Sequence, residues 1–392
     1  MGVRKRILLA VDTGNSMTKA NWGTVSAHNP MEQNNEFYIS KNLKDGYGEE
    51  DIIIPDTEVI DINTAGIPKS VVFTLDSENA SLKEFLGLPV RVHGGSDVVI
   101  QHEHDVVRPT TGSKAEQATT YYSIFSLLYR IAKITGASEL DVVLGTCLPL
   151  ADVELDKDVL DECLIGCHML GNDVKVNIMK NYPVGECFAS SISMTFGMNG
   201  SRKDIAGFLS KGKYLVVNIG AGTTDVALFN NMQFVKGSKD TFTIGGNTIR
   251  ELLISELYKR YRFRISVNAA EQAIKTGKVD IGSKIVSVPE LVEEVKRKFS
   301  LQLMDTIKRY LTQISQALPE LTAVVCVGGG ALEGKYVKEE EERIILSTTS
   351  YLSDYVKVNA PFTEVLVHSK PRFADADGCW IVLCTKEKTT NK

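Results

Sequence analysis

The sequence contains no long apolar run, and this excludes a helix that spans a membrane. Nowhere among the 392 residues do about 18 apolar residues follow one another. The short apolar run Ile7–Val11 lies near a basic start, as in a secretion signal. Asp12 ends this run and no small-residue cleavage site follows, so a core strand is the better interpretation. We therefore expect no contact with a membrane.

The sequence also lacks an excess of positive charge. It has 44 lysines and arginines against 49 acidic residues, for a net charge of -5. A protein that binds along a nucleic-acid duplex needs a concentrated cationic face to neutralise the phosphates. We therefore expect no direct contact with nucleic acid.

Cysteines are few and do not have the spacing of a disulfide framework. The seven residues are an odd number and lie in or beside apolar runs, which predicts reduced thiols and a cytoplasmic protein. Cys163, Cys167 and His168 could bind a metal from adjacent helical turns, but no second ligand pair accompanies them, which favours buried side chains. His102 and His104 are more typical of a solvated strand or loop than of a metal site.

The composition is that of a soluble globular protein, with 43% apolar and 24% charged residues, and the length is comfortable for two domains. Apolar strand-like runs alternate with helical patterns, which predicts an α/β protein with parallel or mixed sheets. We expect a peripheral insertion of loops and short strands at 25–115 and a polar connector at 197–213. The expected strands are Ile7–Val11, Asp141–Leu144, Tyr214–Ile219, Val226–Phe229 and Val324–Val327. The expected helices are 117–135, 246–261 and 288–318.

Three of these strands end in turns of small residues. The first turn is Asp12-Thr13-Gly14-Asn15-Ser16, with Lys19 shortly after it; a helix or the return strand of a hairpin could follow. The second opens with Asn218 and continues as Gly220-Ala221-Gly222-Thr223-Thr224-Asp225. The third is Gly328-Gly329-Gly330, after which a helix is expected. Glycine permits positive φ and the close approach of backbone N–H groups to a phosphate.

Side chains in and near the turns add to this pattern. Ser16, Thr223 and Thr224 carry hydroxyl donors, and Lys19 supplies a positive charge for polyphosphate oxygens. The three consecutive glycines leave a flat surface on which an adenine and a ribose could lie. Each turn alone is compatible with an ordinary β-hairpin. Their order and spacing together predict a nucleotide site.

The three turns resemble the motifs of the superfamily that contains actin, Hsp70 and the sugar kinases. Asp12, Gly14, Lys19 and Ala20 resemble its first phosphate motif, 220–225 its second, and 328–331 its adenosine motif. Two further segments, 180–194 and 373–383, resemble the segments that connect the two domains of the superfamily. In the second of these, the small residues Ala374, Ala376 and Gly378 would allow close helix packing.

The resemblance implies an actin-like fold, with two ribonuclease-H-like domains around a nucleotide cleft. It places one domain at 1–181 plus 355–392 and the other at 182–354. It implies ATP or GTP with Mg²⁺, which Asp12 and Asp225 would hold. The residues that would bind the nucleotide are Asp12, Gly14, Asn15, Ser16, Lys19, Asn218, Gly220, Ala221, Gly222, Thr223, Thr224, Gly328, Gly329, Gly330 and Ala331.

The resemblance of 180–194 implies that Glu186 faces the attacking water, in a reaction where positioning and charge stabilisation dominate. An acidic residue at a helix start also interacts favourably with the helix dipole, and the two roles are compatible. One departure concerns Asn218, since the superfamily usually has aspartate there. An amide cannot take a proton or add negative charge, although it can still hydrogen-bond. We expect binding to persist and hydrolysis to be slower.

The segment 142–154, a strand followed by Gly145, Pro149 and an acidic residue, resembles the ParM-like plasmid-segregation actins. This implies head-to-tail filaments that hydrolyse ATP, and a DNA-binding adaptor protein on a plasmid centromere, so that DNA contact is indirect. The alternative is a small-molecule kinase or signalling ATPase of the same superfamily that does not polymerise. A cell-shape actin at the membrane is a third possibility, and the lack of an amphipathic N-terminal segment disfavours it.

Overall fold

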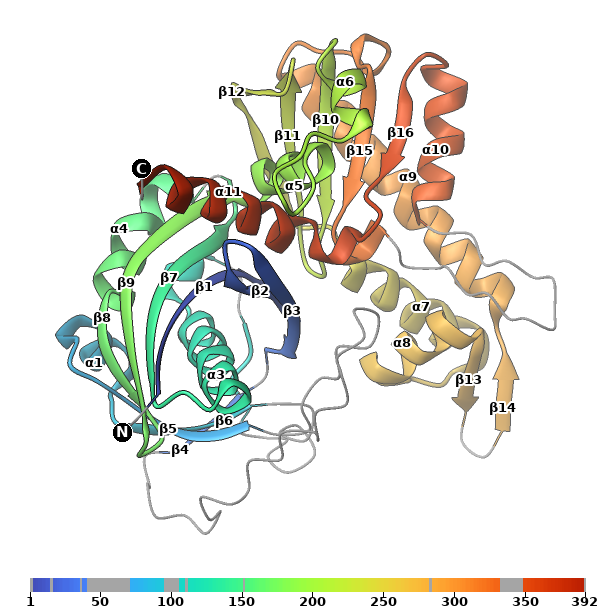
Figure 1. The fold of residues 1–392 in the computed structure, drawn as a ribbon. Coiled ribbons are helices and arrows are strands. Elements are labelled where there is room, and N and C mark those ends of the chain that lie inside the picture. Colours follow the sequence, from blue (N-terminus) through green and yellow to red (C-terminus); the bar gives the residue numbers. More distant parts are fainter. Residues whose placement is uncertain are drawn as a thin grey trace. The chain divides into compact units, whose positions relative to one another are not determined.

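The computed structural model describes residues 3–14, 17–35, 37–40, 71–94, 106–109, 112–150, 152–281, 284–331 and 348–390. The chain divides into two compact units (Figure 1). Unit 1 is Met1–Ser201 with Asp375–Lys392, and unit 2 is Arg202–Ala374. The domain boundaries predicted from the sequence fall earlier along the chain, and residues 182–201 have their contacts in unit 1.

Unit 1 is built on a nine-stranded mixed sheet with the order β3-β2-β1-β7-β9-β8-β5-β6-β4. The strands β1, β7 and β9 run parallel at its centre, and the remaining pairs are antiparallel. The strands are β1 (Arg4–Thr13), β2 (Met17–Thr24), β3 (Ala27–Asn34), β4 (Phe37–Ser40), β5 (Val71–Ser77), β6 (Val90–Gly94), β7 (Glu139–Leu148), β8 (Gly166–Leu170) and β9 (Val174–Gly185).

Helices cover both faces of this sheet. Successive residues of a strand point to opposite faces, so each central strand contributes side chains to two cores. Leu9 and Val11 of β1 pack in one core with α1, α3 and α4, and Leu8 and Ala10 pack in a second core with α5 and α11. Figure 1 shows α3 against one face of the sheet and α11 along the other. The helices are α1 (Ala80–Leu86), the 3-10 turn η1 (Lys114–Glu116), α3 (Ala118–Thr135), α4 (Val153–Leu164), α5 (Glu186–Thr195) and α11 (Ala374–Thr390). A strand buried on both faces explains the unbroken apolar run of β1.

The region 25–115 contains short strands in unit 1, as expected, and the described ones lie toward the two edges of the central sheet. β3 pairs with β2 at one edge, and β5, β6 and β4 lie at the other. Burial of apolar side chains explains this placement. Val71, Phe73 and Leu75, at every second position of β5, all lie in the core of unit 1. His102 and His104 lie outside the described residues.

Unit 2 contains a five-stranded sheet with the order β12-β11-β10-β15-β16 and a separate ribbon of β13 and β14. Its strands are β10 (Lys213–Ile219), β11 (Thr224–Asn230), β12 (Gln233–Phe242), β13 (Lys278–Ile281), β14 (Lys284–Ser287), β15 (Ala323–Val327) and β16 (Glu364–Val367). Its helices are α6 (Asp204–Leu209), α7 (Gly246–Tyr261), α8 (Val267–Thr276), α9 (Pro289–Gln313) and α10 (Thr348–Asn359), with 3-10 turns at Leu318–Glu320, Gly329–Ala331 and Pro371–Phe373.

The core of unit 2 joins one face of the sheet to α7, α8, α9 and α10, and α9 lies beside α10 in Figure 1. The predicted helix at 246–261 is confirmed as α7. The predicted helix at 288–318 ends sooner, at Gln313, where the chain turns at Ser315 with a positive φ of 54°. The predicted connector at 197–213 includes the short helix α6. Within the described residues, no helix has the length and apolarity needed to cross a bilayer.

Gly378 allows α11 to pack closely on α5, as the small residues of this segment predict. A Cβ atom at Gly378 would overlap the backbone oxygen of Ala189. A hydrogen bond of 2.5 Å from Ser190 Oγ to Asp375 Oδ1 joins the same two helices. Since backbone cannot yield as a flexible side chain can, even a methyl group at 378 must separate α5 from α11.

We therefore expect Gly378→Ala to lower the free energy of unfolding by about 2–3 kcal/mol. Both tryptophans of the chain, Trp22 and Trp380, belong to unit 1, so urea denaturation followed by tryptophan fluorescence reports on this unit. The matched control is Gly207→Ala in α6 of unit 2, where a Cβ atom meets nothing within 4 Å. Far-UV circular dichroism, which reports on both units, compares its unfolding with that of Gly378→Ala. The control should be neutral or slightly stabilising, and an equal effect of both changes would contradict the packing argument.

Candidate functional site

The first turn connects β1 to β2 as an antiparallel hairpin, so a return strand follows it and not a helix. Asp12 lies opposite Lys19, and Thr13 opposite Thr18. Gly14 is required at the turn, because a Cβ there would come within 2.8 Å of Lys19 Nζ and 2.9 Å of the Met17 carbonyl oxygen. The two remaining predicted residues of the turn, Asn15 and Ser16, lie outside the described residues.

Asn35, which the sequence analysis did not identify, holds the base of this turn. Its buried side-chain amide donates a hydrogen bond to the carbonyl of Gly14. Its Oδ1 accepts hydrogen bonds from Thr18 Oγ1 at 2.5 Å and from Ser123 Oγ at 2.9 Å. Through these contacts Asn35 joins the turn to β2 and α3 and holds the backbone of Gly14 in place.

Four charged side chains meet beside the first turn: Asp12, Lys19, Lys114 and Glu186. Lys19 Nζ lies 3.3 Å from Asp12 Oδ2, and Lys114 Nζ lies 3.5 Å from Asp12 Oδ1. Lys114 Nζ is also 2.5 Å from Glu186 Oε1. Asp12, Lys114 and Glu186 are each less than 9% exposed. We call these four residues the charged cluster.

The pKa values in the charged cluster follow from the competition between burial and ion pairing. Burial alone would raise the pKa of Asp12, but the Lys19 and Lys114 ammonium groups outweigh it, and the pKa lies below its ordinary value. Burial alone would lower the pKa of Lys114, but Glu186 and Asp12 together raise it above its ordinary value. Asp12 and Lys114 therefore remain charged at neutral pH.

Parallel strands bring the two carboxylates of the cluster to one edge of the sheet. Asp12 in β1 lies opposite Cys147 in β7, and Leu148 in β7 lies opposite Gly185 at the end of β9. Glu186 follows directly as the first residue of α5. The carboxyl ends of parallel strands are where α/β sheets place their ligands. The predicted proximity of Asp12 and Glu186 thus has a simple topological cause.

Lys114, like Asn35, was not found from the sequence. It opens η1, inside the region predicted to be an irregular insertion. A buried carboxylate on α4 positions this turn, because Asp156 accepts hydrogen bonds from Ser113 Oγ at 2.8 Å and from the Ala115 N–H at 3.4 Å. The only local sign of Lys114 in the sequence is a lysine among the small residues 110–115. It does not show that the partners of this lysine are Asp12 and Glu186.

The second turn joins β10 to β11 in unit 2. The N–H of Gly220 donates to the carbonyl of Thr223 at 2.8 Å and closes the hairpin. The carbonyls of Gly220 and Ala221 accept hydrogen bonds from the N–H groups of Gly246 and Asn247 at the start of α7, at 2.9 and 2.7 Å. The carbonyl oxygens of this turn are thus hydrogen-bonded within the protein. In the part of the chain that the structure describes, the N–H groups of 221–223 have no backbone acceptor.

Side chains around the second turn have distinct partners. Asn218 lies opposite Asp225, both buried, and Thr241 Oγ1 donates to Asp225 Oδ1 at 2.5 Å. The hydroxyl of Thr224 donates to the Ile244 carbonyl at 2.6 Å. Because a hydroxyl carries one proton, Thr224 does not supply the donor expected from the sequence. Thr223, which is half-buried, is left as the hydroxyl donor of this turn.

The third turn packs against the end of β10. Gly328 has a φ of +85°, and a Cβ there would overlap the carbonyl oxygen of Ile219; one at Gly330 would overlap the side chain of Ile219. At Gly329 the nearest atom to a Cβ is Arg372 Cγ, at 3.8 Å. Two of the three glycines are therefore needed for packing, and Gly329 is the open one. Ala331 is buried, and the helix expected after it falls outside the described residues.

The structure thus brings together the predicted site residues in two groups. In unit 1, Asp12, Gly14, Lys19 and Glu186 adjoin one another. In unit 2 the second and third turns adjoin through the parallel pairing of β10 with β15, in which Asn218 lies opposite Val327.

The cysteine and histidine residues at 163–168 have structural partners. His168 contacts Ser77 Oγ through Nδ1 at 2.9 Å and the Leu164 carbonyl through Nε2 at 2.8 Å. Burial lowers the pKa of His168 to about 4, so the ring is neutral. The residues that the structure describes contain no group of three or more potential metal ligands among His, Cys, Asp and Glu. The seven cysteines are free thiols.

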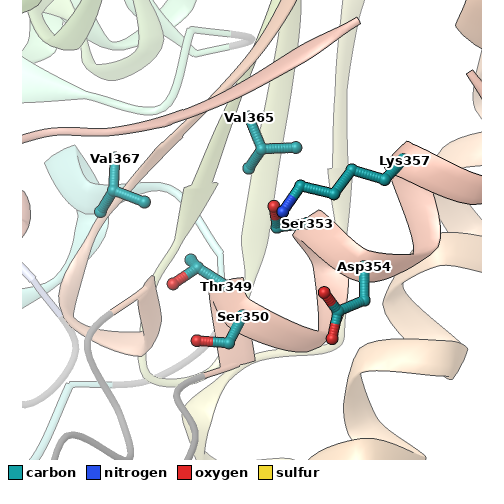
Figure 2. Close-up of a pocket in the computed structure, with 7 residues that line it drawn as sticks. All are labelled: Thr349, Ser350, Ser353, Asp354, Lys357, Val365 and Val367. Carbon is teal, nitrogen blue, oxygen red and sulfur yellow. The ribbon is translucent and has the colours of Figure 1, made fainter. Parts of the chain in front are cut away.

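A pocket of about 300 Å³ lies elsewhere in unit 2, between α10 and β16. Figure 2 shows its lining residues, of which Thr349, Ser350, Ser353, Asp354 and Lys357 come from α10, and Val365 and Val367 from β16. None of the predicted site residues lines it.

Comparison with known proteins identifies the fold. Residues 216–337 match the family model of the C-terminal domain of the archaeal MreB-like actin homologues. A sequence comparison with curated proteins finds no match. The archaeal actin homologue Ta0583 in complex with ADP has a TM-score of 0.63 at 15% identity, over 98% of this chain and all of the other. ParM of Bacillus thuringiensis with ATP has a TM-score of 0.64 at 16% identity, over 98% and 99%. The actin-like protein Alp7A has a TM-score of 0.67 at 12% identity, over 99% and 98%.

Proposed function

We propose that this chain, which has the actin-like ATPase fold, binds ATP with Mg²⁺ and hydrolyses it. The observation that carries the proposal is the charged cluster of Asp12, Lys19, Lys114 and Glu186 at the carboxyl ends of parallel strands. Holding two carboxylates and two ammonium groups together with little exposure to water is costly even when they pair, and charged groups kept at such a cost are candidates for a functional site. That similar folds in Ta0583 and ParM hold ADP and ATP supports this choice of ligand.

The residues present fit a nucleotide with its metal ion. The N–H groups of 221–223 face no backbone acceptor in the described part of unit 2, and Lys19 adds a positive charge, so both suit phosphate oxygens. Asp12 and Asp225 would hold Mg²⁺ through its water ligands, and this ion would neutralise phosphate charge. Asn15, Ser16, Asn218 and the turn 328–331 complete the proposed binding set, with Gly329 beneath the nucleoside.

Glu186 would orient the attacking water and take its proton as the bond to the γ-phosphorus forms and the bond to the ADP oxygen breaks. Lys114 acts through Glu186 as a positioning residue. Its ammonium group fixes the Glu186 carboxylate at 2.5 Å and balances its charge inside the protein.

We further propose that the ATP-bound chain polymerises into dynamic filaments, and that a DNA-binding adaptor on a plasmid centromere couples them to DNA segregation in the cytoplasm. The support is the likeness in fold to ParM and Alp7A, together with the motif at 142–154. A contact between two different surfaces of identical subunits does not close on itself and produces a filament.

The test uses the full chain with ATP and Mg²⁺, followed by phosphate release, sedimentation and electron microscopy. We expect phosphate release together with filaments that disassemble as ATP is consumed. Absence of ATP hydrolysis would overturn the ATPase proposal. Hydrolysis without filaments would overturn the filament proposal alone, and phosphate transfer to an added small-molecule acceptor would identify a kinase.

Asn218→Asp tests the role of the amide in the second turn. We expect turnover to rise about tenfold while ATP affinity changes little, because the new carboxylate adds negative charge beside Asp225 and can accept a proton. Asn230→Asp, at the exposed end of the neighbouring strand β11, is the matched control. Phosphate release and equilibrium binding of a fluorescent ATP analogue give the two quantities, and equal changes in both would count against this role.

A further inference from the structure

The end of α7 and the loop after it form an exposed surface of basic and aromatic side chains, which we call the basic–aromatic patch. It consists of residues 258–264, with the sequence YKRYRFR, and all seven are exposed. Tyr258 is 41% exposed, Tyr261 45% and Phe263 37%. Exposed rings at this density are unusual on a surface that contacts only water.

The positive charge of the patch is only partly balanced. Lys259 pairs with Glu256 at 3.0 Å, and Arg260 pairs with Glu294 at 2.6 Å. Arg262 and Arg264 instead lie over the ring of Tyr258, at 6.0 and 5.3 Å from its centre, and have no acidic partner among the described residues. The net charge of the whole chain hides this local excess, which the sequence analysis did not detect.

The helix α4 of unit 1 exposes a surface of the opposite character. Leu155 and Val159 are 76% and 41% exposed, and the acidic residues Glu154, Asp158 and Glu162 are exposed beside them. Positions 155, 158, 159 and 162 lie on one side of a helix. We call Glu154, Leu155, Asp158, Val159 and Glu162 the acidic–apolar face. The opposite side of α4 is buried through Leu160, Cys163 and Leu164, so the outward apolar residues are not part of the core.

We propose that the acidic–apolar face of one copy of this chain docks on the basic–aromatic patch of a second copy. The proposal rests on the filament part of the proposed function and identifies one contact within it. The two surfaces match in both components, since Leu155 and Val159 can cover the exposed rings while carboxylates pair with the unbalanced guanidinium groups. A nucleic acid would satisfy the basic patch but would leave the exposed Leu155 unexplained.

The contact joins two different surfaces, one in each unit, so it is heterologous. Each copy retains one free face and one free patch after the contact forms, and a further copy can therefore be added at either end. Opposite charges on the two surfaces also favour docking in one direction and oppose contacts between like surfaces.

Charge reversal on either side tests the contact. The variant Asp158→Arg/Glu162→Arg places positive charge on the face, and Arg262→Glu/Arg264→Glu places negative charge on the patch. We expect each variant alone to raise the critical concentration for ATP-dependent sedimentation at least tenfold, with unchanged affinity for ATP. We expect an equimolar mixture to polymerise, because every contact in an alternating filament then joins opposite charges.

The matched control reverses Lys236 and Lys278 to glutamate, two exposed lysines of unit 2 without an ion pair among the described residues. The proposal is overturned if the control raises the critical concentration as much as the patch variant does, if either reversed variant polymerises like the wild type, or if the mixture does not recover. Loss of binding to a labelled single-stranded oligonucleotide by the patch variant, without loss of assembly, would identify a nucleic-acid surface instead.

If the wild-type chain hydrolyses ATP and does not sediment, the filament proposal is overturned, and the docking contact needs a separate test. Sedimentation velocity of the equimolar mixture of the two charge-reversed variants is that test. A complex that neither variant forms alone would support the contact, and its absence would overturn it.

Discussion

Replacing Glu186 with glutamine is expected to lower the rate of ATP hydrolysis by about 10²- to 10³-fold. The amide keeps the size and shape of the side chain but cannot take a proton from the attacking water. ATP affinity should change less than about threefold, because the proposed phosphate donors lie in the turns and not in α5. Single-turnover phosphate release and equilibrium binding of a fluorescent ATP analogue measure the two effects.

The control for this change addresses the simpler role of an acidic residue at a helix start. Glu290 lies exposed in the first turn of α9, as Glu186 lies in the first turn of α5. If Glu186 only stabilises its helix dipole, Glu186→Gln and Glu290→Gln should both cost less than about 1 kcal/mol of stability and leave hydrolysis unchanged. That outcome would remove Glu186 from the proposed mechanism.

The elements that could be predicted from the sequence are those whose causes are local. β1 is buried on both faces, so its five apolar residues from Ile7 to Val11 stand out as an unbroken run. α7 starts at Gly246, the second of two glycines, and ends at Tyr261; the predicted pattern has the same bounds. The short strands β4 and β6 are part of the central sheet through pairing with distant residues, and nothing in their own sequences shows this.

The proposed site divides in the same way. Asp12 and Gly14 are adjacent in sequence to the strand that places them, so the pattern contains both the residue and its position. Lys114 lies 72 residues from its partner Glu186, and Asn35 lies 21 residues from Gly14. A lysine or asparagine in a polar segment has many solvent-exposed counterparts, and only the fold distinguishes the buried ones.

The glycine turns show a second limit. Three consecutive glycines indicate that side chains are excluded, but the sequence does not say by what. At Gly328 and Gly330 the excluding atoms include those of Ile219 in the neighbouring strand, whereas Gly329 has room for a Cβ, with Arg372 Cγ at 3.8 Å. Likewise Gly245 is required because a Cβ there would lie 2.7 Å from the Ala221 carbonyl oxygen. Packing between turns and room for a ligand produce the same pattern in the sequence.

Replacing Lys114 with methionine is expected to destabilise unit 1 by about 3–5 kcal/mol and to reduce hydrolysis strongly. The Glu186 carboxylate, 7% exposed, would lose its 2.5 Å partner and remain buried without a counter-charge. Asp12 would suffer less, because Lys19 stays beside it at 3.3 Å. Urea denaturation followed by the fluorescence of Trp22 and Trp380 measures the stability of this unit.

The double variant Lys114→Met/Glu186→Gln separates charge balance from chemistry. Removing both charges leaves no unpaired carboxylate at Glu186, so most of the lost stability should return, whereas hydrolysis should stay as low as in Glu186→Gln alone. Lys114→Arg should keep the stability within about 1–2 kcal/mol of the wild type, since it retains the positive charge. If the double variant were no more stable than Lys114→Met, the ion pair would not be the source of the cost, and Lys114 would matter through its packing instead.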